Sequence, residues 1–367
     1  MGNKSKILMA MSGGIDSSVA AMILRDNGYE LEGATYRTFD QITESCMAKE
    51  KGCCSVDSIF EAQRMASGMG FGHHILDIRK EFHDSVIVDF INEYLNGRTP
   101  NPCVVCNSDI KWGKLQDVAN SLGCDLIATG HYARIGKTDE GRYFLRKGVD
   151  EAKDQTYFLW KLTQENLSRT IFPLGELTKP EVRQIALEHG HEKLSKKSES
   201  QEICFIPNND YRTFLQDNVE NFDTKYGAGD FIDTEGKILG KHRGFPHYTI
   251  GQRKGLQIAL GEPRYVVNID AKNNRVTLGK KEDLLSKTCY ANQLNLMMVE
   301  DFEEGQEVMA KVRYKSKPGK AKLYHEGTDK VKIVFDDHIE SITPGQSVVF
   351  YTGEGWCDVL GGGILLG

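Results

Sequence analysis

Short apolar runs alternate with amphipathic segments over the first half of the chain. The runs at residues 7–10, 31–36, 74–78 and 125–130 predict buried strands. Between them, segments 57–69, 80–95 and 111–122 carry apolar residues at helical spacing. Strand–helix alternation over this length predicts an α/β domain, a doubly wound parallel sheet with helices on both faces. Residues 96–107 predict a loop, and residues 134–146 predict a hairpin.

The pattern changes at about Tyr211, where short strand-like runs separated by Gly, Asn and Asp turns begin. The turns fall at 227–230, 233–236 and 272–274, and later strands at 308–313, 330–335 and 347–351. We therefore expect three domains: an α/β domain over 1–210, a small mainly β domain over 211–282 and a C-terminal β-barrel over 283–367.

Composition and charge set limits on function. The chain has 367 residues, too many for one ordinary core. Its 46 Lys and Arg against 52 Asp and Glu give a net charge of −6, which argues against bulk nucleic-acid binding but not against a local basic surface. We find no apolar run of membrane-spanning length and no signal peptide, so we expect a cytoplasmic protein without membrane contact. Nine cysteines, an odd number, favour a reducing compartment in which thiols serve chemistry or metal binding.

A glycine-rich turn follows the first strand. Residues 12–18 read SGGIDSS and lead into an amphipathic helix. Two glycines let the backbone approach a ligand, and hydroxyl groups and helix N–H groups surround them, which is typical of an anion site. The turn matches neither the P-loop nor the G-x-G-x-x-G pattern. The alternative is a glycine-rich turn that binds nothing.

Three cysteines lie in two polar segments. Cys103 and Cys106 belong to residues 101–107 (NPCVVCN), and Cys204 to residues 200–207 (SQEICFIP). Two cysteines two residues apart can bind metal or exchange disulfides. Because no histidine pattern or second C-x-x-C completes the set, structural zinc is disfavoured. The residues alone leave open whether these cysteines are reactive or inert.

These motifs together resemble a known family. The turn is similar to the PP-loop of ATP pyrophosphatases, and with the two cysteine segments it resembles the tRNA-specific 2-thiouridylases. Further matching segments are 52–55 (GCCS), 128–133 (ATGHYA), 153–157 (KDQTY), 251–256 (GQRKGL) and 312–314 (VRY). The likeness runs from about Lys6 to Tyr351. The PP-loop alone is shared by other adenylating enzymes, so the combination carries the resemblance.

The resemblance implies an ATP-dependent sulfurtransferase that converts the wobble uridine of tRNA to 2-thiouridine. ATP with Mg²⁺ would be held by Ala10, Met11, Ser12, Gly13, Gly14, Ile15, Asp16, Ser17, Tyr36 and Gly130, with Tyr36 beside the adenine where the family usually has Met. Cys106 matches the nucleophile and Cys204 the persulfide carrier. Asn101, Pro102 and Cys103 would meet the target base. The residues expected to touch tRNA are His131, Lys153, Asp154, Gln155, Arg313, Tyr314 and Gln346.

The implied partners are tRNAs of the Lys, Glu and Gln types and a persulfide donor such as a cysteine desulfurase or a sulfur-relay protein. One departure from the family pattern stands out, because Cys103 replaces the usual Asp. Three cysteines at one site, Cys103, Cys106 and Cys204, suit a [4Fe–4S] cluster, which makes cluster-based thiolation an alternative to the persulfide route. In the other interpretation Cys103 is a tolerated replacement.

A basic stretch lies in the C-terminal region. Lys311, Arg313, Lys315 and Lys317 alternate along a predicted strand and would share one face, and Lys320 and Lys322 follow. Such a face suits phosphate contacts, although a charged strand edge also prevents aggregation. Two other functions stay open: a different PP-loop ligase or amidotransferase, and a non-catalytic RNA-binding module.

Overall fold

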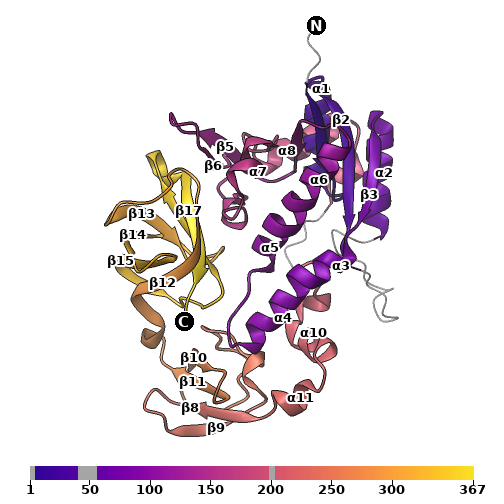
Figure 1. Cartoon of the computed structure of the whole chain (residues 1–367). Coiled ribbons are helices and arrows are strands. Elements are labelled where there is room, and N and C mark those ends of the chain that lie inside the picture. The colour runs from indigo at the N-terminus through magenta and orange to yellow at the C-terminus, as the bar shows by residue number, and fades with distance from the viewer. Residues whose placement is uncertain (1–4, 40–55, 198–202) are drawn as a thin grey trace.

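Figure 1 shows a computed structural model of the chain, which describes residues 5–39, 56–197 and 203–367. A parallel sheet flanked by helices, a small four-stranded sheet and a closed barrel make up the described part. Cys46, Cys53, Cys54 and residues 200–202 of the Cys204 segment lie outside the described residues. No helix of the described part is long and apolar enough to cross a membrane.

The first sheet has the order β3-β2-β1-β4-β7, and all its strands are parallel. Its strands are β1 (Lys6–Ala10), β2 (Glu30–Arg37), β3 (Gly72–Asp77), β4 (Leu126–Ala128) and β7 (Thr170–Ile171). The four predicted strands are confirmed. The strand β7 was missed because two residues carry no recognisable pattern. The chain order reverses between β1 and β4, and ligands of such sheets bind at this switch point.

Helices cover both faces of this sheet, as predicted. Ile7 and Met9 of β1 join the core formed with α1 (Ile15–Asp26), α2 (Val56–Met69) and α8 (Lys179–Glu188). Leu8 points to the opposite face and packs in the core formed with α6 (Gly113–Ser121). Successive strand residues face opposite sides, so one fully buried strand supports two cores.

The predicted loop over 96–107 is too long. Helical structure begins at Pro102, with α5 (Pro102–Val105) continuing into the π-helical segment η2 (Cys106–Trp112) and α6. Proline suits a first helical turn because it has no N–H to leave unpaired. Upstream, the helix predicted over 80–95 comprises α3 (Arg79–Phe82), η1 (His83–Ile87) and α4 (Val88–Leu95). Cys106 therefore lies on a helix and not in a loop.

The small middle sheet follows two helices that the sequence analysis missed, α10 (Tyr211–Asn218) and α11 (Phe222–Lys225). Its order is β10-β11-β8-β9. The strands are β8 (Gly229–Ile232), β9 (Ile238–His242), β10 (Tyr265–Asp270) and β11 (Arg275–Gly279). The shorter elements of the described chain are α7 (Gln164–Ser168), α9 (Glu192–Ser195), η3 (Thr156–Phe158), η4 (Pro207–Asn209), η5 (Phe245–His247), η6 (Glu282–Leu284) and η7 (Glu354–Trp356).

The C-terminal strands form the predicted barrel, which the pairing of β12 with β17 closes. Its strands are β12 (Leu285–Leu296), β13 (Gln306–Lys311), β14 (Gly319–His325), β15 (Lys330–Glu340), β16 (Ser347–Thr352) and β17 (Asp358–Leu365). The predicted hairpin is present as β5 (Ala133–Lys137) and β6 (Tyr143–Lys147), and it adds to this sheet through β6 and β17. The Arg146 guanidinium donates two hydrogen bonds to Asp358 at this junction.

The basic strand predicted from Lys311 to Lys317 is wrong. Strand β13 ends at Lys311, and a turn follows because the Ser316 hydroxyl bonds the backbone N–H and C=O of Arg313. Lys320 and Lys322 lie on β14 within 3.8 Å and 3.7 Å of the Glu307 carboxylate. The six cations therefore do not share one face.

Candidate active site

The SGGIDSS turn connects β1 to α1 and is held by its own hydroxyl groups. The Ser12 N–H donates to Ser17 Oγ at 3.1 Å, and the Ser18 hydroxyl donates to the Gly14 carbonyl at 2.9 Å. Gly13 has a φ of +69°, and a Cβ there would overlap the backbone carbonyl of Ser58. The turn thus needs glycine for both its conformation and its closeness to α2.

Asp16 lies in the first turn of α1, where two side chains from distant elements hold it. The Tyr132 hydroxyl donates to Asp16 Oδ1 at 2.8 Å, and Lys179 Nζ donates to the same oxygen at 2.7 Å. Lys179 opens α8, and only 8% of its side chain is exposed. A buried ammonium beside this turn adds positive charge where the sequence predicts phosphate binding.

Two other elements border the turn. Lys197 Nζ donates to the Gly13 carbonyl at 3.0 Å and also pairs with Glu61 of α2. Gly130 follows β4, and a Cβ there would lie 2.6 Å from the Ser17 nitrogen. The two predicted nucleotide segments, the turn and Gly130, therefore meet at the switch point. Ala10 ends β1, and Met11 and Ile15 are buried beneath the turn.

Tyr36 connects the predicted adenine side of the site to the helix of Cys106. It lies near the end of β2 and donates its hydroxyl to the Lys111 carbonyl of η2 at 2.7 Å. Burial first, and then the nearby Cys106, raise the pKa of Tyr36 well above its ordinary value. The phenol is therefore neutral and acts as a hydrogen-bond donor, and its bond to Lys111 joins the end of β2 to the helical segment that begins at Cys106.

Cys106 and Cys204 pack against one hydrophobic core. Both are half-buried against the cluster that includes Phe82, Phe90 and Phe205. Cys103 sits one helical turn before Cys106 and is exposed. Within the described ranges, no group of three or more His, Cys, Asp or Glu residues is arranged to hold a metal ion. The fold thus brings the two predicted sulfur-handling cysteines to the same core from segments about a hundred residues apart.

The predicted target-base residues begin α5. Asn101 precedes the helix, its side chain bonds Tyr157, and Pro102 is buried in the first turn. The barrel reaches this segment, because Gln346 Nε2 donates to the carbonyls of Thr99 and Pro100 at 3.1 Å and 2.8 Å. Of the residues predicted to touch tRNA, Gln346 therefore lies next to the predicted target-base residues.

The predicted tRNA residues 153–155 differ in environment. Asp154 is buried, accepts a hydrogen bond from the Thr156 hydroxyl at 2.8 Å, and has its pKa raised by burial. The side-chain oxygen of Gln155 accepts the Tyr132 N–H at 3.0 Å. Lys153 is half-buried. Asp154 therefore makes its hydrogen bond to Thr156 inside the protein. Gln155 bonds Tyr132, the residue whose hydroxyl donates to Asp16.

His131 and Tyr314 lie against aromatic neighbours. His131 bonds the Thr129 hydroxyl at 2.8 Å, and burial, with a contribution from Lys111, lowers its pKa well below the ordinary value. The Tyr314 ring lies 4.4 Å from the ring of Phe158, and Arg313 next to it is half-buried. Residues 313–314 and 156–158 are therefore neighbours across the first domain and the barrel.

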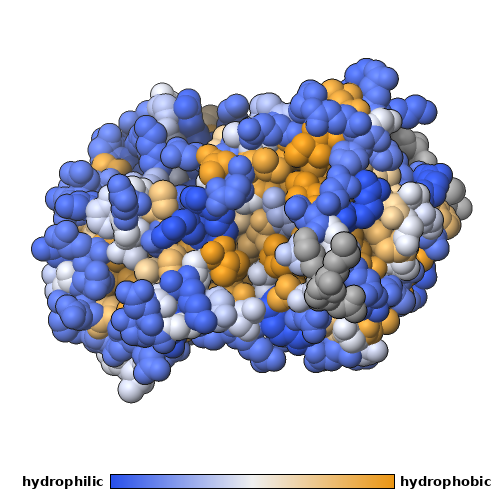
Figure 2. Space-filling view, turned by 90° about the horizontal axis from the view of Figure 1, so that it is seen from above, coloured by the Kyte–Doolittle hydropathy of each residue, from blue (hydrophilic) through white to orange (hydrophobic). Residues whose placement is uncertain are grey.

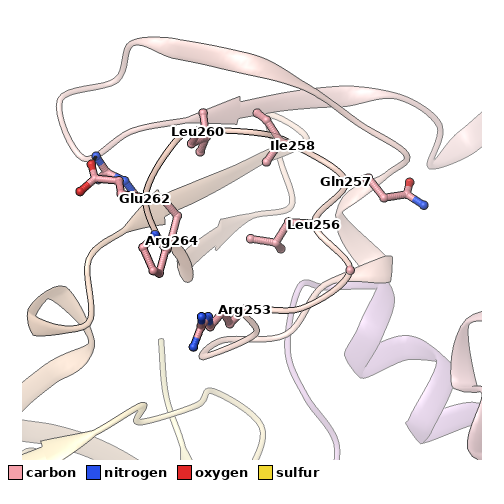
Figure 3. A pocket seen from close by; sticks show the side chains of 9 residues that line it. Arg253, Leu256, Gln257, Ile258, Leu260, Glu262 and Arg264 are labelled. Carbon is pink, nitrogen blue, oxygen red and sulfur yellow. Dashed lines mark hydrogen bonds and ion pairs between the residues drawn. The ribbon is translucent and has the colours of Figure 1, made fainter.

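Figure 2 shows hydrophobic residues gathered along a hollow in the middle of the face seen from above, with polar residues around it. A separate pocket of about 250 Å³ belongs to the middle sheet region. Arg253, Leu256 and Arg264 line it, together with other residues of the 253–264 loop (Figure 3). None of the predicted site residues lines this pocket.

Comparison with known proteins assigns the chain to a family. Three family models match in succession: a tRNA methyl transferase HUP domain over 5–208, a tRNA methyl transferase PRC-barrel domain over 212–280 and an aminomethyltransferase beta-barrel domain over 286–365. A tRNA-specific 2-thiouridylase MnmA of Amoebophilus asiaticus is 48% identical over 98% of this chain and 95% of its own length. The enzyme of the same name from Cytophaga hutchinsonii is 47% identical over 99% and 98%. The chain belongs to the tRNA-specific 2-thiouridylase family.

Among solved structures, a 4-thiouridine synthetase in complex with RNA and ATP is 21% identical, with a TM-score of 0.36 over 58% of this chain and 50% of its own. An NAD synthetase from Campylobacter jejuni gives 18% identity and a TM-score of 0.33 over 55% and 71%. These values are too low to add to the assignment. The relatives of the thiouridylase family, matched from end to end, carry it.

The candidate site around the SGGIDSS turn includes contacts from residues that sequence reasoning missed. Tyr132, Lys179 and Lys197 meet the PP-loop from three elements far along the chain. Tyr132 lies inside the matching ATGHYA segment, which is the one signal that marked it. Lys179 and Lys197 stand in ordinary helical and polar sequence, where a lysine predicts only a solvated surface.

The side chains of the candidate site differ in how well they suit the two expected inorganic cofactors. The Asp16 carboxylate in the first turn of α1 has the chemistry that suits Mg²⁺, which prefers oxygen ligands and substrate phosphates. An iron–sulfur cluster needs converging thiolates, and the described residues bring only Cys106 and Cys204 onto one core while Cys103 is exposed. The arrangement fits a pair of sulfur-handling cysteines better than a cluster.

Proposed function

We propose that this chain is an ATP-dependent tRNA 2-thiouridylase that converts the wobble uridine of tRNA to 2-thiouridine, with AMP and pyrophosphate as products. The observation that carries the proposal is identity of 43–48% over almost the whole chain to proteins of that name. The packing of Cys106 and Cys204 on one core supports it, because the chemistry requires two thiols that can meet.

In the first step, the C2 oxygen of uridine attacks the α-phosphorus of ATP and pyrophosphate leaves. The PP-loop N–H groups and the ammonium of Lys179 would bind the phosphates. Mg²⁺ held by Asp16 would neutralise phosphate charge in this step. Adenylation turns a poor leaving group into AMP, so position C2 becomes open to attack by sulfur.

In the second step, the terminal sulfur of a Cys204 persulfide attacks C2, and the bond from C2 to the AMP oxygen breaks. The Cys106 thiolate then attacks the inner sulfur of Cys204, which releases the thiolated uridine and forms a Cys106–Cys204 disulfide. A two-electron thiol reductant restores both cysteines. The persulfide would come from a cysteine desulfurase or sulfur-relay protein, and the substrates would be tRNAs of the Lys, Glu and Gln types.

Cysteine variants test the proposal. Cys106→Ser and Cys204→Ser should each abolish 2-thiouridine formation, measured by mass spectrometry of tRNA nucleosides, yet leave ATP and tRNA binding intact. Binding depends on backbone amides and phosphate contacts, none of which needs a thiol. Cys357→Ser is the matched control, because this half-buried thiol lies directly before β17 of the barrel and is not part of the core that Cys106 and Cys204 share. Full thiolation by either catalytic variant would contradict the proposal.

Cys103→Ser separates the persulfide route from the cluster route. With a persulfide, the variant should keep substantial activity, since the family pattern that the sequence resembles usually has Asp at this position. With a cluster on Cys103, Cys106 and Cys204, the variant should lose iron and activity together. Iron and labile sulfide measured on anaerobically purified protein, with thiolation followed before and after chelation, decide between the routes.

A further inference from the structure

A turn of the C-terminal barrel lies against the segment that leads to the Cys106 helix. This turn, residues 343–346, joins β15 to β16, and the chain between α4 and α5 passes beside the barrel in Figure 1. The Thr99 N–H donates to the Pro344 carbonyl at 2.8 Å. Gly345 has a φ of +88°, and a Cβ there would lie 2.8 Å from the Thr99 carbonyl oxygen. The two segments therefore fit together without space for a side chain.

Gln346 completes this contact with its side-chain amide. Its Nε2 donates to the carbonyls of Thr99 and Pro100. A side-chain amide carries two N–H donors, so both have acceptors in the protein. The backbone carbonyl of Gln346 also accepts the Leu365 N–H at 2.8 Å, which joins Gln346 to the last strand, β17. Gln346 thus ties the end of the barrel to Pro100.

The neighbouring barrel residue holds the next position of the same segment. The Tyr157 hydroxyl donates to the Ser347 carbonyl at 2.8 Å, and it also bonds the Asn101 side chain. From Pro102 onward the chain is helical through Cys106. Residues 100–101 therefore lie directly before the helical segment that carries Cys106, and their placement bears on where this segment begins.

We propose that Gln346 is a positioning residue for thiolation, which holds the backbone before α5 so that Cys106 meets the Cys204 sulfur and the target base. This role rests on the proposed function and differs from the direct tRNA contact that the resemblance implies. In this proposal the barrel also helps to position the nucleophile Cys106, in addition to its expected contacts with tRNA. Gln346 is 247 positions from Thr99 and 246 positions from Pro100 in the chain, so the contact joins distant parts of the sequence.

Gln346→Glu and Gln346→Met test the proposal. Glu keeps the shape but offers no N–H and places a carboxylate against two carbonyl oxygens, while Met keeps the length without charge. Gln306→Ala is the matched control, since Gln306 is also half-buried on the barrel but its side-chain amide donates to the carbonyl of the adjacent Glu307. Each Gln346 variant should lower kcat for thiolation by about 10- to 100-fold, which is the effect of a misplaced reacting group. The KM for tRNA should stay nearly unchanged.

A second measurement needs no activity. The rate at which iodoacetamide alkylates Cys106 is followed across pH by peptide mass spectrometry in the absence of tRNA. The profile of this rate against pH should differ between the Gln346 variants and the wild type, whereas the profile of Cys357 in the same protein should stay the same. A higher KM for tRNA with unchanged kcat and unchanged Cys106 alkylation would overturn the proposal in favour of direct tRNA contact. Wild-type kinetics and alkylation in both variants would also overturn it. A wild-type protein that fails to thiolate would instead refute the proposed function.

Discussion

At the scale of single residues, the sequence marked residues of the SGGIDSS turn and its matching segments, but not the lysines that reach the turn from distant elements. Asp16 and Gly130 were predictable because they stand in recognisable segments. Lys179 was not, because its role depends on α8 packing beside α1. A lysine in an amphipathic helix predicts a solvated surface, and only tertiary structure shows that this one is buried on a carboxylate.

Removal of the charge at either partner of this buried pair should impair adenylation. We expect Asp16→Asn and Lys179→Met to slow tRNA-dependent pyrophosphate release by about 100- to 1,000-fold, the usual effect of losing one preorganised electrostatic group. Circular dichroism should show an intact fold. Lys80→Met is the control, because the Lys80 side chain is 87% exposed and pairs with Asp84 on the surface. Pyrophosphate release at the wild-type rate would remove Asp16 and Lys179 from the nucleotide site.

At the scale of elements, strands with continuous apolar runs were predictable, whereas the turn after Lys311 and the helix start at Pro102 were not. Residues 7–10 of β1 form a continuous apolar run, so the position of this buried strand was evident from the sequence. The basic stretch after Lys311 alternates as a strand would, yet Ser316 turns the chain at Arg313. Local hydrogen bonds such as those of Ser316 override the alternation of charge. Pro102 starts a helix where its presence suggested a loop, because proline suits the first helical turn.

The turn over residues 312–318 should carry the RNA contacts that we expected from a whole strand. Combined Arg313→Ala and Lys315→Ala should weaken tRNA binding and lower the slope of log affinity against log salt by about 0.7 to 0.9 for each phosphate that the variant no longer neutralises. Lys320→Ala with Lys322→Ala should change the slope little, because Glu307 already pairs with both lysines. Filter binding from low to high salt measures both slopes. Equal slopes for the two double variants would place the RNA elsewhere.

At the scale of the whole molecule, the order of the α/β domain, the small β domain and the barrel was predictable from the change in hydrophobic and turn pattern. The contacts between them were not. Pairing between distant segments leaves no local signal, so neither the β6–β17 junction nor the contact of Gln346 with Pro100 could be foreseen. The predicted hairpin was identified correctly as a hairpin, whereas its membership in the barrel sheet emerged only from the structure. The first domain and the barrel consequently share one hydrogen-bonded sheet.

This shared sheet should make the hairpin depend on the barrel. Asp358→Asn weakens the pair with Arg146, in which the Asp358 side chain is only 10% exposed, and should lower the free energy of unfolding by about 1–3 kcal/mol. It should also speed tryptic cleavage within β5 and β6. Asp139→Asn at the exposed hairpin tip is the control. Equal cleavage rates in the two variants would show that the hairpin holds its place without the barrel.

The same junction sets an order of events during biosynthesis. Arg146 and Asp358 are 212 residues apart, so the hairpin leaves the ribosome long before the strand that receives it has been translated. Strand β17 pairs with β16, β12 and β6, and it comes last among these strands in the chain. Until β17 is made, the nascent protein carries an open sheet edge, the kind of edge that recruits other chains. A chain that terminates before β17 would therefore be prone to aggregate as well as inactive.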